Sequence, residues 1–408
     1  MKVVDAATMR ELDRRAIEEA RIPGAVLMER AGAGLADACA VFASALPAKH
    51  ARRFVLLAGK GNNGGDAFVA ASLLPSLLPR VEVALHCICP PEELKGDAAK
   101  MFKRLSSEMR NFARFEFSSS SLRPGDIIVD GLLGTGFSGE PRAPFNEWIK
   151  TVNASGLPVI AIDIPSGLDA TTGSASCAIE ADLTVTMALP KIGMFRGEGP
   201  RLCGRLKIVD IGFPNSFVEA APSKLEATFA GSIRSQFGRE PFDSHKNSRG
   251  HVLVVGGSHF YPGAPALSAS AALKAGAGLV TLAIPEGAVF PGSIPNAIIV
   301  RRLSDGGLGS FNKTSLPALR ELLAKAKAVA VGPGMSTESS CAEIVRAVVD
   351  SGRHAVFDAD ALNLIAADPS LLKGLNAPCI LTPHPGEMLR LAEGVGLKSA
   401  GISREQSA

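Results

Sequence analysis

Residues 56–74, LLAGKGNNGGDAFVAASLL, join an apolar run to an apolar helical pattern through a glycine-rich loop. Gly59, Gly61 and Gly64 have the G-x-G-x-x-G spacing of dinucleotide-binding loops, in which glycine lets the backbone approach a phosphate at a helix N-terminus. A loop of this kind between a strand and a helix predicts a parallel α/β sheet. The spacing alone is a weak signal for any particular ligand.

Apolar runs alternate with helical or loop segments along the whole chain, which is typical of parallel sheets covered on both faces. The runs predicted to form strands are 54–59, 81–88, 126–134, 157–167 and 181–190 in the first half, and 251–257, 279–285, 328–334, 354–360 and 379–386 in the second. A polar connection with Pro and Gly separates the two series. We therefore predict two α/β domains, residues 1–222 and 223–408.

The composition narrows the class of function. The net charge of +3 over 408 residues, without a dense basic stripe, gives no support for nucleic-acid binding. No apolar stretch reaches the roughly 20 residues of a membrane span. Seven cysteines without the spacing of metal ligands indicate a reduced, cytoplasmic protein.

Thr8 and Glu11 have the spacing of a capping box and predict the start of the first helix there.

Two common nucleotide-binding motifs are incomplete or absent in this sequence. An ordinary Rossmann domain places an acidic residue about 20 positions after the glycine loop, at the end of the next strand, to hold the ribose. That strand ends LHCICPP, without a carboxylate. The phosphate loop GxxxxGK[ST] is also absent. These observations lower the probability of a dehydrogenase and of a P-loop enzyme.

Three glycine-rich loops are predicted at the carboxyl ends of strands, where open α/β sheets bind ligands. They supply six oxygen-bearing side chains: Asn62, Asn63, Asp66, Asp130, Asp163 and Ser166. Neutral oxygens with few carboxylates suit a hard cation of low charge. The alternative is that the residues of the first loop only cap a turn and a helix, as Asn and Asp often do.

The motifs GKGNNGGDAF, VDGLLGTGFSGEPR, IDIPSGLDATTG and TVTMALPKIGM, in this order, resemble the NAD(P)H-hydrate epimerase domain, the YjeF N-terminal family. The likeness covers roughly residues 1–215. It implies a Rossmann-like three-layer domain that interconverts the R and S epimers of hydrated NADH and NADPH with a bound potassium ion. Arg30 departs from the family pattern, on a helix that could belong to the interface of a homo-oligomer, the state we expect.

Motif matching implies a role for specific residues. Asn63, Asp130 and Ser166 would hold the potassium. The hydrated nucleotide would be bound by Asn62, Asn63, Gly64, Gly65, Asp66, Gly134, Thr135, Gly136, Phe137, Ser138, Gly139, Glu140 and Asp163.

The chemistry of the reaction selects the catalytic candidates. The epimerised carbon bears a hydroxyl and the ring nitrogen, so a protonated hydroxyl can leave as water through a cation that the nitrogen stabilises. Water then adds to the other face. This route needs proton transfer near the hydroxyl and a negative charge near the cation. Asp163 is the candidate carboxylate and Lys191 a candidate for positioning or proton transfer; a phosphate contact or a solvated lysine are the alternatives for Lys191.

The second half contains HVLVVGGSHFYPGAPALSAS, VAVGPGMS, AVFDADALNLIA and ILTPHPGEMLRLA, which resemble the ADP- or ATP-dependent NAD(P)H-hydrate dehydratase, a ribokinase-like α/β domain. The resemblance implies that Ala264, Gly334 and His384 contact the hydrated nucleotide. A structural or merely exposed role is the alternative for His384. Asp358 and Asp360 are expected to cap the helix that follows them.

Part of the dehydratase pattern is absent from these residues. The family's KG turn and GxGD helix start, which serve the phosphate donor and the chemistry, do not follow residue 384. We therefore expect a truncated ribokinase-like domain, no dehydratase activity from these 408 residues alone, and an exposed apolar sheet edge. A fragment, a split gene product and a shortened domain kept for assembly remain alternatives.

Two other classes of function compete with this interpretation. The ribokinase-like half allows a small-molecule kinase, but the GxGD base that phosphoryl transfer would need is missing. A non-catalytic nucleotide-binding protein is the other alternative. The sequence favours a metabolite-repair epimerase.

Overall fold

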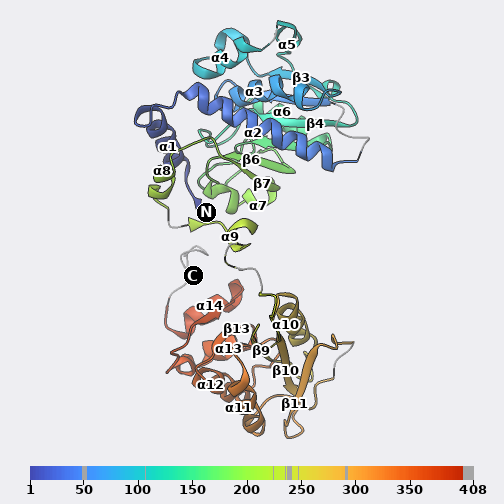
Figure 1. The fold of residues 1–408 in the computed structure, drawn as a ribbon, viewed down its shortest axis with the longest axis vertical. Coiled ribbons are helices and arrows are strands. Elements are labelled where there is room, and N and C mark those ends of the chain that lie inside the picture. The colour runs from blue at the N-terminus through green and yellow to red at the C-terminus, as the bar shows by residue number, and fades with distance from the viewer. Residues whose placement is uncertain are drawn as a thin grey trace. The chain divides into compact units, whose positions relative to one another are not determined.

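The computed structural model describes residues 1–47, 53–105, 107–223, 225–234, 236, 241–246, 248–289 and 293–397, except the side chains of residues 108, 111 and 112 (Figure 1). The chain divides into two compact units, residues 1–238 and 239–408. Each unit is described by itself. The domain boundary after residue 222 stays a prediction from the sequence.

The first unit contains a parallel sheet in the order β3-β2-β4-β5-β6-β7. Its strands are β2 (Arg53–Ala58), β3 (Glu82–Cys87), β4 (Asp126–Gly131), β5 (Val159–Ile162), β6 (Leu183–Met187) and β7 (Arg205–Val209). The helices of this unit are α1 (Ala6–Glu18), α2 (Gly24–Ala45), α3 (Asn62–Leu77), α4 (Gly96–Arg104), α5 (Ser107–Phe112), α6 (Phe145–Ala154), α7 (Gly199–Leu202), α8 (Asn215–Ala220) and α9 (Ala230–Arg234).

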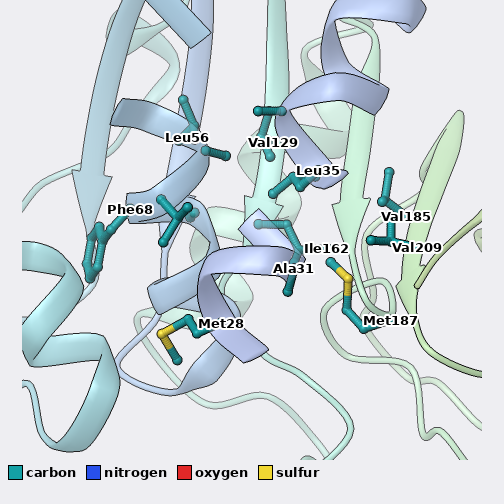
Figure 2. Packing of buried hydrophobic residues seen from close by; sticks show 14 of the residues in the cluster. Met28, Ala31, Leu35, Leu56, Phe68, Val129, Ile162, Val185, Met187 and Val209 are labelled. Atoms are coloured by element: carbon teal, nitrogen blue, oxygen red, sulfur yellow. The ribbon is translucent and has the colours of Figure 1, made fainter. Parts of the chain in front are cut away.

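Successive side chains along each strand point to opposite faces of the sheet, where they join two apolar layers. Phe54 and Leu56 of β2 pack with α2 and α3 on one face, whereas Val55 and Leu57 pack with α6 on the other. Figure 2 shows the first layer, where Met28, Ala31 and Leu35 of α2 lie over the strands. The result is the three-layer α/β arrangement predicted from the sequence.

The N-terminal segment is tied to the rest of the first unit. β1 (Lys2–Val3) pairs antiparallel with β8 (Leu225–Glu226). Helix α1 then starts at Ala6, with Asp5 as its cap, because the Asp5 carboxylate accepts a hydrogen bond of 2.7 Å from the Thr8 amide. The capping box predicted at Thr8 and Glu11 is therefore wrong, since an earlier acidic residue occupies the cap.

The second unit contains a parallel sheet in the order β11-β10-β9-β12-β13-β14. Its strands are β9 (His251–Val255), β10 (Leu279–Pro285), β11 (Ile298–Leu303), β12 (Ala328–Val331), β13 (His354–Phe357) and β14 (Cys379–Leu381). Its helices are α10 (Gly263–Lys274), α11 (Leu316–Lys325), α12 (Ala342–Asp350), α13 (Asp360–Ala367) and α14 (Pro385–Gly394). Leu253 and Val255 of β9 pack with α11, α12 and α13, while Val254 packs with α10.

Strands β7 and β11 were missed by the sequence analysis. Both lie at an edge of their sheet and interrupt their apolar pattern with exposed basic residues, such as Arg205 and Arg301. Charged side chains are common on edge strands, where they oppose pairing with other chains. The apolar-run criterion therefore found the central strands and overlooked these edges.

Strand β14 forms the other edge of the second sheet. The exposed fractions of Ile380 and Leu381 are 61% and 38%, so this edge is apolar and open among the described residues, as the sequence predicted. No helix in the described ranges is long and apolar enough to cross a membrane.

Candidate functional site in the first unit and its counterpart in the second

The loops after β2, β4 and β5 lie next to one another at the carboxyl ends of these strands, because the strands are parallel neighbours in the first sheet. The Gly59 amide donates a hydrogen bond of 2.9 Å to the carbonyl oxygen of Gly131, which joins the first two loops. A Cβ atom at Gly64 would lie 1.8 Å from the Gly59 carbonyl oxygen. Only glycine allows α3 to begin this close to the loop.

Asn63 connects α3 to the other two loops. Its Nδ2 donates hydrogen bonds to the carbonyl oxygens of Leu133 at 3.0 Å and Ile162 at 2.7 Å. A Cβ atom at Gly134 would lie 2.6 Å from Asn63 Oδ1. Helix α3 is capped by Gly61 without a side-chain hydrogen bond. The alternative that Asn63 only caps the helix is therefore wrong.

Asp130 and Ser166 form a buried pair between the second and third loops. The Ser166 hydroxyl donates to Asp130 Oδ1 at 2.6 Å, and the Ser166 amide donates to Asp130 Oδ2 at 2.8 Å. Both residues are fully buried. Burial raises the pKa of Asp130 to about 6, although the hydrogen bonds from Ser166 and Leu132 oppose this rise.

These residues fit the potassium ion that the resemblance implies. Asn63 Oδ1 receives no hydrogen bond from the described residues, and the buried Asp130 carboxylate lacks a cationic side chain among them. A bound cation would offset the cost of burying that charge. In the described part of the chain, no three of His, Cys, Asp or Glu gather as metal ligands. The available ligands are one carboxylate and neutral oxygens, a set suited to low charge.

An ion pair between Asp163 and Lys191 lies beside this cluster. Asp163 follows β5 with φ of 63°, a left-handed conformation that is rare outside glycine. Its Oδ1 accepts hydrogen bonds from Lys191 Nζ and, at 3.0 Å, from the Met187 amide. Lys191 Nζ also donates to Thr186 Oγ1 at 2.9 Å. Lys191 is fully buried, so the alternative of a solvated lysine is wrong.

A cleft of about 140 Å³ opens next to this ion pair. Its lining residues are Met9, Asp13, Ile17, Gly24, Leu27, Met28, Ala31, Asn62, Asn63, Asp66, Asp97, Thr135, Asp163, Met187, Lys191 and Ile211. The cleft therefore combines an apolar wall, mainly from α1 and α2, with carboxylates and one cation.

Asp66 and Asp13 are the cleft carboxyl groups with raised pKa values. Burial raises the pKa of Asp66 well above its usual range, and the nearby Asp163 and Asp13 carboxylates raise it further. Burial also raises the pKa of Asp13 to about 6, with a further contribution from Asp163 and an opposing one from Lys191. Perturbed carboxyl groups in a cleft are typical of sites that transfer protons.

In the second unit, the loops after β12, β13 and β14 are joined by two side-chain hydrogen bonds. Asp360 Oδ2 accepts from the Ser336 amide at 3.0 Å, and Thr382 Oγ1 donates to Asp358 Oδ1 at 2.8 Å. Helix α13 begins after Ala359 without a side-chain cap. The expectation that Asp358 and Asp360 cap this helix is therefore wrong, because their carboxylates hold the neighbouring loops.

The three residues predicted to contact the nucleotide in the second unit lie at the carboxyl ends of the parallel strands of its sheet. Ala264 is near the start of α10, which follows β9, while Gly334 follows β12 and His384 follows β14. His384 caps α14, because its Nδ1 accepts a hydrogen bond of 3.1 Å from the Gly386 amide. The His384 side chain also remains 61% exposed. It thus has a structural role, and its contact with a nucleotide stays a prediction.

Comparison with known protein families matches both units. A model described as the YjeF-related protein N-terminus matches residues 24–193, and a model described as NAD(P)H-hydrate dehydratase matches residues 252–407. The bifunctional NAD(P)H-hydrate repair enzyme Nnr of Moorella thermoacetica is 37% identical, over 100% of this chain and 77% of that protein. The chain belongs to the bifunctional NAD(P)H-hydrate repair enzyme family.

Other relatives extend the comparison. The Nnr protein of Salinibacter ruber is 35% identical over 99% of this chain and 78% of its own length. Among solved structures, the yeast protein ynu0 is 23% identical, with a TM-score of 0.44 over 56% of this chain and 98% of that chain. An ADP/ATP-dependent NAD(P)H-hydrate dehydratase from Bacillus subtilis, co-crystallized with ATP/Mg2+, is 27% identical, with a TM-score of 0.33 over 40% of this chain and 54% of that chain.

The structure brings only part of the predicted epimerase residues to the cleft. Those that line it are Asn62, Asn63, Asp66, Thr135, Asp163 and Lys191. Gly64 and Gly65 contribute close packing at the start of α3, and Gly134 contacts Asn63. Residues 136–140 lie outside the lining and are mostly exposed. The nucleotide contacts assigned to that loop stay predictions.

Asp13 is a cleft residue that the sequence analysis missed. It lies in α1, outside the matched range 24–193 and far in sequence from the glycine-rich loops. One signal in the sequence could have identified it: Asp13 is an acidic residue next to the apolar positions Met9 and Leu12, which are buried. Arg30 has an internal role, because its Nη1 donates a hydrogen bond of 3.1 Å to the carbonyl oxygen of Ile211, a residue of the cleft.

The buried ion pair leads to a prediction for stability. Lys191→Met keeps the apolar stem but leaves the Asp163 carboxylate without its cation, so unfolding of the variant should cost about 3–5 kcal/mol less. The double variant with Asp163→Asn should lose less than the two single variants summed, because no unpaired charge remains in the cleft. Urea or thermal unfolding measures both effects.

A matched control is Arg201→Met, which breaks only exposed ion pairs with Glu180 and Glu198 and should change stability little. Strictly additive losses from Lys191→Met and Asp163→Asn would show that the two residues are not coupled.

Proposed function

We propose that the cleft of the first unit interconverts the R and S epimers of hydrated NADH and hydrated NADPH. The observation that carries this proposal is the Asp163–Lys191 ion pair, which presents a fixed carboxylate to a cleft that also contains Asp66. Membership of the repair enzyme family supplies the substrate class.

The reaction needs a negative charge beside the cation that forms when the hydroxyl leaves as water. Asp163 supplies this charge, and Lys191, Thr186 and the Met187 amide fix its direction. A preorganised charge costs no rearrangement at the moment of reaction, which is why it stabilises a transition state more than solvent water does. The apolar wall around Leu27 and Met28 restricts the water that reaches the cation.

Potassium is the proposed cation of the first unit. Asn63, Asp130 and Ser166 would hold it, because they bring one carboxylate and neutral oxygens together between the three loops. A bound ion would fix the position of these loops and would offer a charge that can bind a phosphate oxygen of the nucleotide.

The second unit is proposed to bind the S epimer and to serve its dehydration with ADP or ATP. Ala264, Gly334 and His384 would contact the hydrated nucleotide at the carboxyl ends of the parallel strands. The proposal follows from membership of the family and from the dehydratase model that matches this unit. We also propose a cytoplasmic homo-oligomer; the seven free cysteines are consistent with a reducing compartment.

The epimerase assignment predicts a coupled result. In a mixture of R and S hydrates with a separately supplied intact dehydratase, the chain should accelerate the recovery of NADH from the R epimer. Asp163→Asn should abolish this acceleration, because the cation loses its fixed counter-charge. The measurement is the absorbance of NADH over time.

Glu180→Gln provides a control, since Glu180 is not among the residues that line the cleft and its side chain forms an exposed ion pair with Arg201. Circular dichroism should accompany each assay, because Asp163→Asn leaves Lys191 buried without its partner. If wild-type chain gives no acceleration, the epimerase proposal fails and a non-catalytic nucleotide-binding protein is favoured.

The potassium assignment predicts an effect of the ion on stability as well as on rate. The melting temperature should be higher in potassium chloride than in tetramethylammonium chloride of equal ionic strength, because only potassium enters the oxygen cluster. Asp130→Asn should remove the difference. Equal melting temperatures of the wild-type chain in the two salts would refute the assignment.

A further inference from the structure

We propose that Asp13 exchanges a proton with the hydroxyl of the hydrated nicotinamide ring, as the acid when the hydroxyl leaves and as the base when water returns. The inference rests on the proposed epimerase function and assigns to it a residue outside the matched family range. Four features of the first unit support it: the position of α1, the absence of a partner for Asp13 among the described residues, the burial of Asp66, and the different surroundings of the cleft carboxyl groups.

Helix α1 is held next to the Asp163–Lys191 pair by the backbone that precedes it. The Val4 amide donates to the carbonyl oxygen of Pro190 at 3.0 Å, and the Ile192 amide donates to the carbonyl oxygen of Val4 at 2.9 Å. These two bonds flank Lys191 in sequence. The position of Asp13 relative to the ion pair is therefore fixed by backbone hydrogen bonds rather than by side-chain packing alone.

The Asp13 carboxyl group is available for a ligand. It lines the cleft, and no described residue donates a hydrogen bond to it or forms an ion pair with it. The basic residue that follows it, Arg14, is bonded instead to Glu11 and Glu18 on the exposed side of α1. The cleft thus contains a half-buried carboxyl group that the described residues leave without a partner.

Asp66 independently indicates that a ligand enters this cleft. Its side chain lines the cleft with an exposed fraction of only 5%, and none of the described residues donates a hydrogen bond to it. Its carboxyl oxygens are accessible from the cleft and can accept hydrogen bonds there. A polar ligand in the cleft would supply the missing partner.

The surroundings give the three carboxyl groups different tasks. Asp163 forms an ion pair with Lys191, whereas Asp66 is buried without a cation in contact among the described residues and favours its neutral form. Asp13 lies between these extremes, with a pKa of about 6, so it can both give up and recover a proton near neutral pH. The other charged groups that line the cleft are Lys191 and Asp97.

The proton transfer balances without any further reactant. Asp13 gives its proton to the hydroxyl, the C–O bond breaks with its electron pair on oxygen, and water leaves a cation shared with the ring nitrogen. A water molecule then adds to the opposite face and releases one proton. That proton returns to Asp13 through water in the cleft, so one oxygen is exchanged and the protein ends in its starting state.

The test compares Asp13→Asn with Glu11→Gln, a matched change on the exposed side of the same helix. Asp13→Asn should lower kcat for epimerisation about 100-fold or more with little change in KM, because general acid–base catalysis typically contributes at least that factor. Glu11→Gln should keep the wild-type kcat. Asp13→Glu, which retains a carboxyl group, should recover part of the lost rate.

The pH profile separates proton transfer from a structural role. Wild-type kcat/KM should fall as the pH rises above about 6, because Asp13 of the free protein then loses its proton, and Asp13→Asn should lack this decline. A carboxyl group whose pKa is raised on folding stabilises the protein below its unfolded pKa and loses that contribution as the pH rises through the folded value. Asp13→Asn should therefore be no less stable than wild type at pH 8.

Each outcome has a distinct meaning. If the wild-type chain fails to epimerise, the proposed function itself is overturned. If the wild-type chain is active and Asp13→Asn retains its kcat, the assignment of Asp13 is overturned. The same conclusion follows if Asp13→Asn loses activity together with its stability at pH 8, because Asp13 would then act by supporting the fold.

Discussion

The cleft of the first unit depends on a buried ion pair, in which Lys191 is fully enclosed and its ammonium group contacts Asp163. A charge of this kind is costly to bury, so it persists only where the geometry satisfies its remaining donors. Thr186 Oγ1 and the Met187 carbonyl oxygen provide that geometry from the end of β6. The ion pair also fixes a carboxylate in an uncommon backbone conformation, at the place where the sheet opens to the cleft.

The parallel sheet determines which loops can reach this ion pair. Because β2, β4 and β5 are neighbours, the glycine-rich loop, the Asp130 loop and the Asp163 loop lie side by side. Asn63 then joins them through two backbone carbonyl oxygens. The glycines of this region allow the loops to pack closely against one another. Within each loop, the residues of the oxygen cluster and those of the cleft are therefore only a few positions apart.

The two units use the same principle with different chemistry. In each, hydrogen bonds accepted by carboxylates join the loops at the carboxyl ends of parallel strands. In the first unit Asp130 is buried and the neighbouring Asp163 is paired with Lys191, whereas His384 of the second unit remains exposed beside an open, apolar edge strand. Burial of charge thus distinguishes the proposed epimerase cleft from the loop cluster of the second unit.

The central strands and the glycine-rich loops could be predicted from the sequence, because apolar runs and glycine spacing are local signals. Motif order also indicated the family, and with it Asn63, Asp130, Asp163 and Ser166. The edge strands β7 and β11 could not be predicted in this way, since their basic residues mask the apolar pattern.

What only the tertiary structure decided is which side chains share a cleft and how each is charged. Asp13 is 150 residues from Asp163 in sequence and joins it because Val4 pairs with the backbone around Lys191. The sequence determined that an aspartate stands at position 13 and an oxygen-rich loop at position 63. Their chemistry depends on burial and on neighbours brought together by the sheet, and neither property is encoded locally in the chain.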